Sequence, residues 1–443
     1  MDFTKKSFNK ETILIFILCL VGIILRFMWP EDMQWKADQI YMWEHAKAIA
    51  EGKGIEWIGM PSGVSVRNPG LGLWIFSFIA LFCDSPPDMV PFIAAFNVIA
   101  IIIFFYFVQS KISIEGKNIY GDNPQTWLWA VALYCVNPMA ILFSRDIWAT
   151  NTLSIFTVLI MMGAYSRQDK WGAFCWGMFG AMIGQIHMPG FFFSFGIVVF
   201  MFLHDKKNNI KTNWFFWFLG SVVGTIPMLP WIPYAIEYYA NKSTVAHQVE
   251  SSFSFAKHFN LKFFYYLAYD SIGVHLRFMM GGKAKDIWQG PLLLGKSTYL
   301  LGICYVYLVG ILVWKAKFLV FKLIETLKQL YERTFFVKLT FIDQLLYSTV
   351  IGMGIVLTIT GIRIHPHYLS CLYPIILFWP IKIFIKHKRI LFGIILCQLL
   401  ISFSFFRYVH VNEGVQGQEY GDTYRYIMEQ RKLNPNYQSN KGH

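Results

Sequence analysis

Apolar stretches of about 20 residues recur along this chain of 443 residues, and charged residues rarely interrupt them. A helix of that length crosses about 30 Å of hydrocarbon. Inside a bilayer only helices and closed barrels satisfy every backbone polar group, and the long alternating strands of a barrel are absent from the sequence. With 56% apolar and 15% charged residues, we expect an all-α polytopic membrane protein and exclude an ordinary soluble domain.

About eleven transmembrane helices are expected. The predicted spans are residues 12–29, 91–109, 127–143, 150–165, 171–187, 189–203, 214–231, 298–314, 342–361, 367–381 and 389–406. The apolar segment 70–82 has only about 13 residues and is predicted to be a juxtamembrane helix that does not cross the bilayer. Residues 1–405 are expected to form one transmembrane domain, followed by a short outward tail at 406–443.

The net charge of +13 is distributed unevenly over the two sides of this topology. Segments on the side of the N-terminus hold 20 of the 39 basic residues but only 8 of the 26 acidic ones. Basic residues accumulate on the cytoplasmic side of membrane proteins. We therefore expect a protein of the plasma (inner) membrane with a cytoplasmic N-terminus, membrane lipids as partners and no nucleic acid. The basic segment 315–338 has apolar residues near helical spacing and is predicted to lie on the anionic inner leaflet.

No metal or cofactor motif is found in the sequence. The seven cysteines lie nearly all inside apolar segments without the spacing of metal ligands, which predicts packing residues. No Gly-rich phosphate loop and no HExxH constellation occurs. We expect no cofactor; a divalent metal held by His and Asp stays an open alternative that no spacing indicates.

Polar residues gather on the outward side in four clusters. The first lies in the loop 30–69 and includes Asp38 and Arg67; the second is Ser144-Arg145-Asp146 continuing to Asn151; the third is His187 to Gly190; the fourth is Arg363 to Tyr368, with His365 and His367. A protein that needed only anchors at a membrane surface would use Trp, Tyr and Lys there. This pattern therefore indicates a functional site.

Each residue type in the clusters suits one step of a group transfer. Asp38 is the candidate general base that activates a hydroxyl. Cationic side chains suit a phosphate leaving group, because guanidinium pairs with phosphate through two parallel hydrogen bonds. The candidate phosphate-binding residues are Arg145, Arg363, His365, His367 and Arg67, with Asp146, Asn151 and His187 as secondary candidates.

Structural roles stay open for several of these residues. Asp38 could be the N-cap of a helix over 39–51. Arg145 could extend along apolar surface with its charge in the headgroups, and Asp146 could simply pair with it. The histidines could be turn or helix-end residues.

Five motifs, in this order, resemble the C-type membrane glycosyltransferase superfamily, in particular the family-39/83-like enzymes such as protein O-mannosyltransferases and lipid A aminoarabinose transferases. They are the first-loop pattern from Tyr41 to Gly54, RNPGLGLW (Arg67 to Trp74), NPMAILFSRDIWATNTL (Asn137 to Leu153), QIHMPGFFF (Gln185 to Phe193) and HPHYLSCLYP (His365 to Pro374). The resemblance covers residues 12–405.

The resemblance implies a transfer from a polyprenyl-phosphate sugar to a hydroxyl of a lipid, glycan or protein acceptor at the outer face. It implies that Asp38 is the acidic residue of the first loop. The acidic residue of the second loop aligns near Asn151, with Asp146 as the alternative, and the lysine of the family's Lys-Pro turn is replaced by Asn68. Displacement opposite the phosphate predicts inversion at the anomeric carbon.

Two other classes of protein are alternatives. A transporter or flippase of lipid-linked sugars would have similar spans and outward charges, but no paired broken helices are evident in matching halves of the sequence. A membrane scaffold would leave the Asp, Arg and His clusters unexplained.

Overall fold

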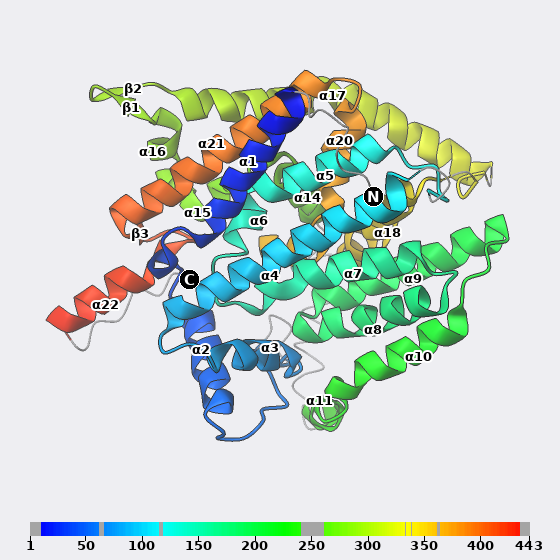
Figure 1. Cartoon of the computed structure of the whole chain (residues 1–443), viewed down its shortest axis with the longest axis horizontal. Coiled ribbons are helices and arrows are strands. Elements are labelled where there is room, and N and C mark those ends of the chain that lie inside the picture. Colours follow the sequence, from blue (N-terminus) through cyan, green and yellow to red (C-terminus); the bar gives the residue numbers. More distant parts are fainter. Residues whose placement is uncertain are drawn as a thin grey trace.

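The computed structural model of the chain describes residues 10–61, 66–114, 118–240, 261–332, 334–337, 339–360 and 364–434. Helices form most of this part of the chain (Figure 1). Its strands form two antiparallel hairpins, β1 (Leu292–Leu293) with β2 (Lys296–Ser297) and β3 (Gly414–Val415) with β4 (Gly421–Asp422).

The α-helices before the first hairpin are α1 (Lys10–Phe27), α2 (Ala37–Ala50), α3 (Leu71–Ala80), α4 (Pro86–Phe107), α5 (Pro124–Val136), α6 (Pro138–Leu142), α7 (Leu153–Tyr165), α8 (Lys170–Ile186), α9 (Pro189–Asn208), α10 (Trp214–Thr225), α11 (Trp231–Ala240), α14 (Lys262–Ile272), α15 (Arg277–Met280) and α16 (Ala284–Gln289). Those after it are α17 (Leu300–Tyr331), α18 (Phe341–Thr349), α19 (Val356–Thr360), α20 (Phe378–Phe384), α21 (Lys388–Asn412) and α22 (Tyr424–Leu433). The short helical turns used below are η1 (Pro30–Asp32), η3 (Ala149–Thr152), η6 (Val350–Ile355) and η7 (Pro366–Leu372).

Within the described residues, five helices are long and apolar enough to cross a membrane: Pro86–Ile112, Pro189–Asn208, Leu300–Lys317, Phe341–Ile359 and Lys388–Asn412. Two bent helix pairs raise the number to seven if each pair is one span. The predicted class, an all-α protein with membrane-length helices, is thus confirmed. The prediction of about eleven spans stays a prediction, because several of the expected spans correspond to shorter helices such as α5 and α7.

Two helices bear on the expected topology. The apolar segment predicted at 70–82 forms α3, whose ten residues reach about 15 Å and are too short to cross the hydrocarbon. The predicted span 298–314 was expected to end at residue 314, but α17 runs on without interruption to Tyr331, and its 32 residues reach about 48 Å in all. The second half of α17 exposes apolar residues such as Phe321, Ile324 and Leu327.

Glycines allow helices to approach closely where the bundle packs tightly. A Cβ at Gly220 of α10 would lie 2.0 Å from the carbonyl oxygen of Phe174 in α8. A Cβ at Gly177 of α8 would lie 2.0 Å from that of Trp217 in α10. Such small residues are common where membrane helices pack together, because packing there depends on close contact of the backbones.

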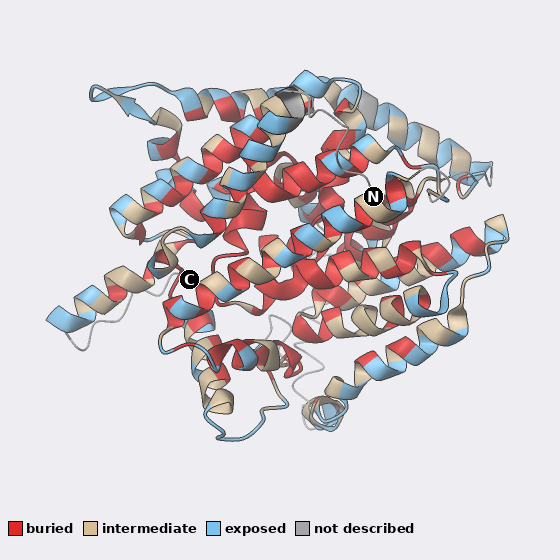
Figure 2. Cartoon of the chain, viewed as in Figure 1, coloured by how far each residue is buried: buried red, intermediate tan, exposed pale blue. Residues whose placement is uncertain are grey.

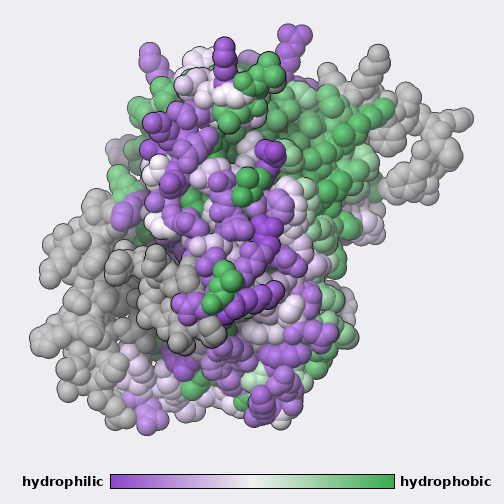
Figure 3. Space-filling model, turned by 90° about the vertical axis from the view of Figure 1, so that its left-hand side faces the viewer, coloured by the Kyte–Doolittle hydropathy of each residue, from purple (hydrophilic) through white to green (hydrophobic). Residues whose placement is uncertain are grey.

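The surface divides into a polar end and an apolar flank. Buried residues fill the interior of the bundle, and exposed ones line the outer sides of helices such as α1 and α17 (Figure 2). Figure 3 shows hydrophilic residues on the face toward the viewer and a hydrophobic surface on its right, which is the side of α1 and α4 seen in Figure 1. Exposed apolar residues on those two helices include Phe16, Ile17, Leu20, Ile99 and Ile102.

We call the end of the bundle where α2, α3 and α22 lie the α2 end (Figure 1). The segment 406–443 was expected to be an outward tail. In the structure α21 continues to Asn412, and the β3–β4 hairpin and α22 follow it. Residues 419–425 of this region contact the loop before α2.

Candidate functional site

Contacts between side chains join the four polar clusters at the α2 end. Gln39 of α2 donates from Nε2 to Oδ2 of Asp146 over 2.8 Å, which links the first cluster to the second. The ring of His367 lies 4.5 Å from that of Trp148 and 5.4 Å from that of His187, measured between centroids. The second, third and fourth clusters therefore also meet.

The first helical turn of α3 packs against the same assembly. A Cβ added to Gly72 would lie 3.4 Å from the Cβ of Ala149 in η3 and 3.6 Å from the carbonyl oxygen of Ile186 at the end of α8. Elements far apart in the sequence thus surround one place at the end of the bundle.

Asp38 is the second residue of α2, and its side chain is exposed. Nearby protein atoms displace water and raise the pKa of the Asp38 carboxyl above the ordinary aspartate value, while the charge of Lys36 opposes this rise. Tyr41 and His45 follow at helical spacing, so the three polar side chains lie along one side of α2. The rings of Tyr41 and His45 stack with their centroids 3.9 Å apart.

Asp146 is a buried carboxylate close to Asp38. Its Oδ2 accepts the hydrogen bond from Gln39, and its Oδ1 accepts one from the backbone N–H of Ile147 over 2.8 Å. Burial raises the pKa of Asp146 to about 7, partly offset by those two hydrogen bonds and by Lys36, and the negative charge of Asp38 adds to the rise. Two acidic groups with different exposure are therefore near enough for the charge of one to affect the pKa of the other.

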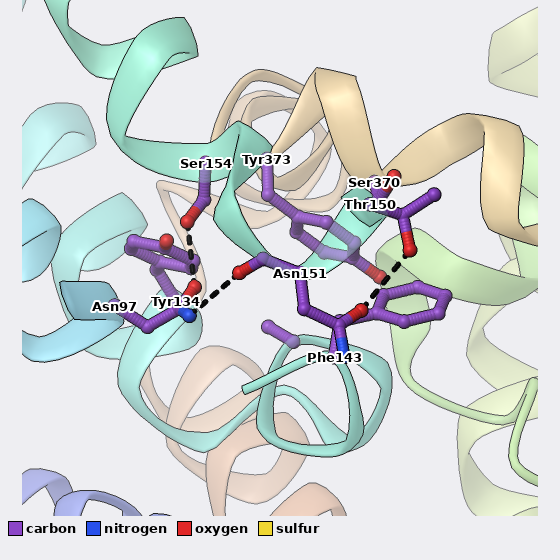
Figure 4. Close-up of a pocket in the computed structure, with 9 residues that line it drawn as sticks. Asn97, Tyr134, Phe143, Thr150, Asn151, Ser154, Ser370 and Tyr373 are labelled. Atoms are coloured by element: carbon purple, nitrogen blue, oxygen red, sulfur yellow. Dashed lines mark hydrogen bonds between the residues drawn. The ribbon is translucent and has the colours of Figure 1, made fainter. Parts of the chain in front are cut away.

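Asn151 supports Asp146 from the interior side. Its Nδ2 donates to the backbone oxygen of Asp146 over 2.8 Å, and its Oδ1 accepts from Thr150 Oγ1 over 3.0 Å. The backbone oxygen of Asn151 accepts from Asn97 Nδ2 over 2.8 Å, and Asn97 accepts from Ser154 over 2.6 Å (Figure 4). The side chain of Asn151 is thus occupied within the protein, and Asp146 is the acidic residue that this loop presents next to Asp38.

A small pocket lies beside Asn151 (Figure 4). Its volume is of the order of one water molecule. It is lined by Asn97, Tyr134, Ala140, Phe143, Thr150, Asn151, Ser154, Ser370 and Tyr373. It is too small to hold a sugar ring in this conformation.

Arg145 does not face solvent in the structure, because its side chain is 4% exposed. Its guanidinium donates to the backbone oxygens of Leu25 and Trp29, at the C-terminal end of α1, and lies 4.3 Å from the ring centroid of Phe406. Burial lowers the pKa of Arg145 to about 10, so it stays charged at neutral pH. This geometry favours a structural role for a residue that the sequence suggested for phosphate binding.

Arg67 is half-buried and lies next to the helix that carries Asp38. Its Nε donates to the backbone oxygen of Gly59 over 2.9 Å, and its Nη2 donates to the hydroxyl of Tyr41. Trp231, where α11 begins, donates from Nε1 to the backbone oxygen of Arg67 over 2.8 Å. Arg67 thus places a positive charge one helical turn from Asp38.

The predicted histidines form one group. The rings of His365 and His367 stack with centroids 5.4 Å apart, and His187 approaches His367 from the end of α8. The buried Nε2 of His187 and Nε1 of Trp148 have no hydrogen-bond partner among the described residues. Arg363, the remaining candidate of this cluster, lies outside the described residues.

The described residues contain no group of three His, Cys, Asp or Glu side chains that could hold a metal ion. Two further polar residues of this site, Gln39 and His45, were not predicted from the sequence. Gln39 holds Asp146, and His45 pairs through Nδ1 with Glu56 Oε1 over 2.6 Å. The spacing of residues 38, 41 and 45 on a predicted helix was a signal that could have identified His45.

No family model, no curated protein and no solved structure matches this chain.

Proposed function

We propose that this protein is a membrane glycosyltransferase that moves a sugar from a polyprenyl-phosphate donor to a hydroxyl of a lipid, glycan or protein acceptor. The carrying observation is that the exposed Asp38 directly precedes Gln39, whose side chain holds the buried Asp146, at the polar end of an apolar helix bundle. We also propose a topology with eleven spans, as in the C-type glycosyltransferases. In it the N-terminus is cytoplasmic and the α2 end lies outside the plasma membrane.

In the proposed reaction the acceptor oxygen attacks the anomeric carbon while Asp38 takes the hydroxyl proton. A bond forms between that oxygen and the carbon, and the bond from the carbon to the phosphate oxygen breaks. The electron pair leaves with the polyprenyl phosphate, and attack opposite the leaving group inverts the anomeric centre. The raised pKa of Asp38 supports the role of a base, because a more basic carboxylate accepts a proton more readily.

Positive charge near the leaving phosphate stabilises the transition state, where negative charge grows on the phosphate. We assign the positive charge to Arg67, and hydrogen bonds from ring N–H groups to the phosphate to the group of His187, His365 and His367. Arg67 is half-buried, one turn from Asp38, and can reach a ligand. We assign Arg145 a structural role instead, because its guanidinium donates to backbone oxygens at the end of α1.

One observation favours a transporter or flippase as a second candidate. The helix pair Pro366–Leu372 and Ile375–Phe384 is bent by 90°, and the pair Trp214–Met228 and Trp231–Ala240 is bent by 69°. Broken membrane helices build the substrate sites of many transporters. The location of Asp38 and Asp146 argues against this candidate, because both residues lie at the end of the bundle and not at its middle.

The first test is transfer by the purified protein. Incubation with a radiolabelled polyprenyl-phosphate sugar and a membrane extract should yield a labelled product. Asp38→Asn should lower the rate by about 10²- to 10⁴-fold, the usual contribution of a general base. The matched control is Glu44→Gln, which removes the same charge from an exposed position of the same helix and should leave the rate unchanged.

A rate for Asp38→Asn within a few-fold of wild type would show that Asp38 is not the general base.

The transporter candidate is tested with the same protein in liposomes. Movement of an unmodified lipid-linked sugar between leaflets, without any labelled product, would support that candidate.

A further inference from the structure

We infer that the C-terminal region of the chain is a brace that positions the site, and that Arg425 is a positioning residue for Asp38. We call residues 410–425 the C-terminal brace; they contact the first loop at residues 32–36, directly before α2. The inference deepens the proposed function and rests on it for the role of Asp38. The contacts themselves do not depend on any activity.

Asp32 is the polar centre of this contact and is 2% exposed. Its Oδ2 pairs with Nδ1 of His410 over 2.7 Å, and its Oδ1 pairs with Nη2 of Arg425 over 3.2 Å. Its backbone oxygen accepts from the hydroxyl of Tyr420 over 2.6 Å. Removing one partner from a buried carboxylate is costly, because the remaining charge is left without compensation.

The backbone of the first loop pairs with the brace as well. The N–H of Tyr424 donates to the oxygen of Met33 over 3.0 Å, and Gln34 forms an antiparallel bridge with Thr423. Lys36, the N-cap residue of α2, donates from Nζ to the backbone oxygen of Glu419.

Trp35 completes the contact, since its ring meets the ring of Tyr424 edge-on with centroids 5.1 Å apart. Five consecutive residues, 32–36, thus each contact the brace. The loop before α2 is therefore held over its whole length.

The brace is itself fixed from a third direction. The N–H of Tyr420 donates to the backbone oxygen of Met279 over 3.1 Å, and Gln418 accepts from the N–H of Gly282 over 2.9 Å. Thr423 Oγ1 donates to the backbone oxygen of Glu413 over 3.0 Å. The brace therefore joins the first loop to the region of α15.

The position of Asp38 follows from these contacts. α2 begins at Ala37, and Asp38 lies two residues after the last braced residue. A shift of the loop would rotate or displace the first turn of α2 and move the carboxyl relative to Asp146. Misplacement of a catalytic group by about 1 Å can lower a rate by about 10²-fold.

The test combines local hydrogen exchange with initial rates for the full-length protein. Arg425→Ala should raise amide exchange in a peptide over residues 32–45 at least several-fold and lower the transfer rate about 10- to 100-fold with unchanged donor affinity. Arg425→Lys should restore part of both, because it keeps the charge without the fork of donors. The control is Lys432→Ala, which removes a positive charge from an exposed position of the same helix.

Three outcomes decide the inference. Unchanged exchange over 32–45 in Arg425→Ala would overturn the brace, whatever the activity. Raised exchange with an unchanged transfer rate would overturn the positioning of Asp38. If the wild-type protein transfers no sugar, the proposed function fails while the exchange result still decides the brace. If Arg425→Ala does not fold, Thr423→Val serves as the second variant, since it removes a hydrogen bond within the brace, from Thr423 Oγ1 to the backbone oxygen of Glu413. Unchanged exchange over 32–45 in that variant would overturn the brace.

Discussion

At the residue scale, Asp146 makes stability depend on pH. Its pKa is about 7 in the folded protein and about 3.9 in an unfolded chain. Between these values the unfolded state has lost its proton and the folded state keeps it. Stability therefore falls as pH rises from about 4 to about 7, and the loss is complete above pH 7, of order 4 kcal/mol.

We expect Asp146→Asn to remove this part of the pH dependence. The unfolding temperature of the wild type in detergent should fall more steeply between pH 4.5 and pH 7.5 than that of the variant. Other buried carboxyls, such as Asp122 with its pKa raised to about 7 by burial, titrate alike in both proteins and cancel in the comparison. Parallel curves would show that Asp146 is ionised or solvated in the folded state.

Two arginines of the site should respond differently to truncation. Arg145→Ala leaves the backbone oxygens of Leu25 and Trp29 without their donor, at a cost of about 1–3 kcal/mol for each buried group. It should lower the unfolding temperature. Arg67→Ala should leave that temperature nearly unchanged and weaken binding of the donor, because Arg67 is half-buried and reaches solvent.

The measurement is a thermal melt beside a titration with the polyprenyl-phosphate sugar. A stable Arg145→Ala variant with lost donor binding would return the phosphate contact to Arg145 and reject our assignment of Arg67.

The residue types predicted a site, and contacts now join Asp146, His187 and His367 into one assembly, although their catalytic roles stay predictions. The sequence could not show that Arg145 lies at the end of α1, because that contact joins residues about 120 positions apart. Position in the sequence places a charge at a membrane surface but does not reveal which backbone oxygens it meets.

At the scale of helices, the α8–α10 contact should depend on glycine. Gly220→Ala places a Cβ against the backbone of Phe174, with three of its atoms within 3.0 Å, so the helices must separate. Overpacking of this kind typically costs about 1–3 kcal/mol. The matched control is Gly310→Ala in α17, where nothing lies within 4 Å of the added Cβ.

We expect a lower unfolding temperature for Gly220→Ala and no decrease for Gly310→Ala in the same detergent. Equal melting temperatures for the two variants would show that α8 and α10 are not in close contact in the protein.

Apolar runs in the sequence predicted where helices lie but not where they bend or continue. The segment 70–82 forms a helix of ten residues, too short to cross the hydrocarbon, and its place beside the membrane stays a prediction. The bends at residues 366–384 and the continuation of α17 past residue 314 were not predicted. Composition reports how apolar a segment is, whereas bends depend on the neighbours that satisfy the freed backbone groups.

At the scale of the whole molecule, the apolar flank suits contact with lipid, whereas the polar end suits contact with water. Exposed residues such as Phe16 and Ile102 suit lipid, whereas the exposed Asp38 suits water. The brace extends this division, since it adds the ion pairs of Asp32 with His410 and Arg425 to the α2 end.

We expect the N-terminus to be cytoplasmic and the α2 end to lie outside, because basic residues are in excess on the side of the N-terminus in the expected topology. Single cysteines replacing Lys53 and Lys285, both exposed, should react with a membrane-impermeant thiol reagent on intact cells. Cysteines replacing Lys111, Lys207 and Lys386, also exposed, should react only after the cells are opened. The background is a parent protein without its natural cysteines, whose transfer rate or melting temperature shows that it is still folded. Labelling of the second set on intact cells would reverse the orientation and place Asp38 in the cytoplasm. If the cysteines at positions 53 and 285 were labelled from opposite sides of the membrane, the loops that carry them would not share one side. The proposed site would then be wrong.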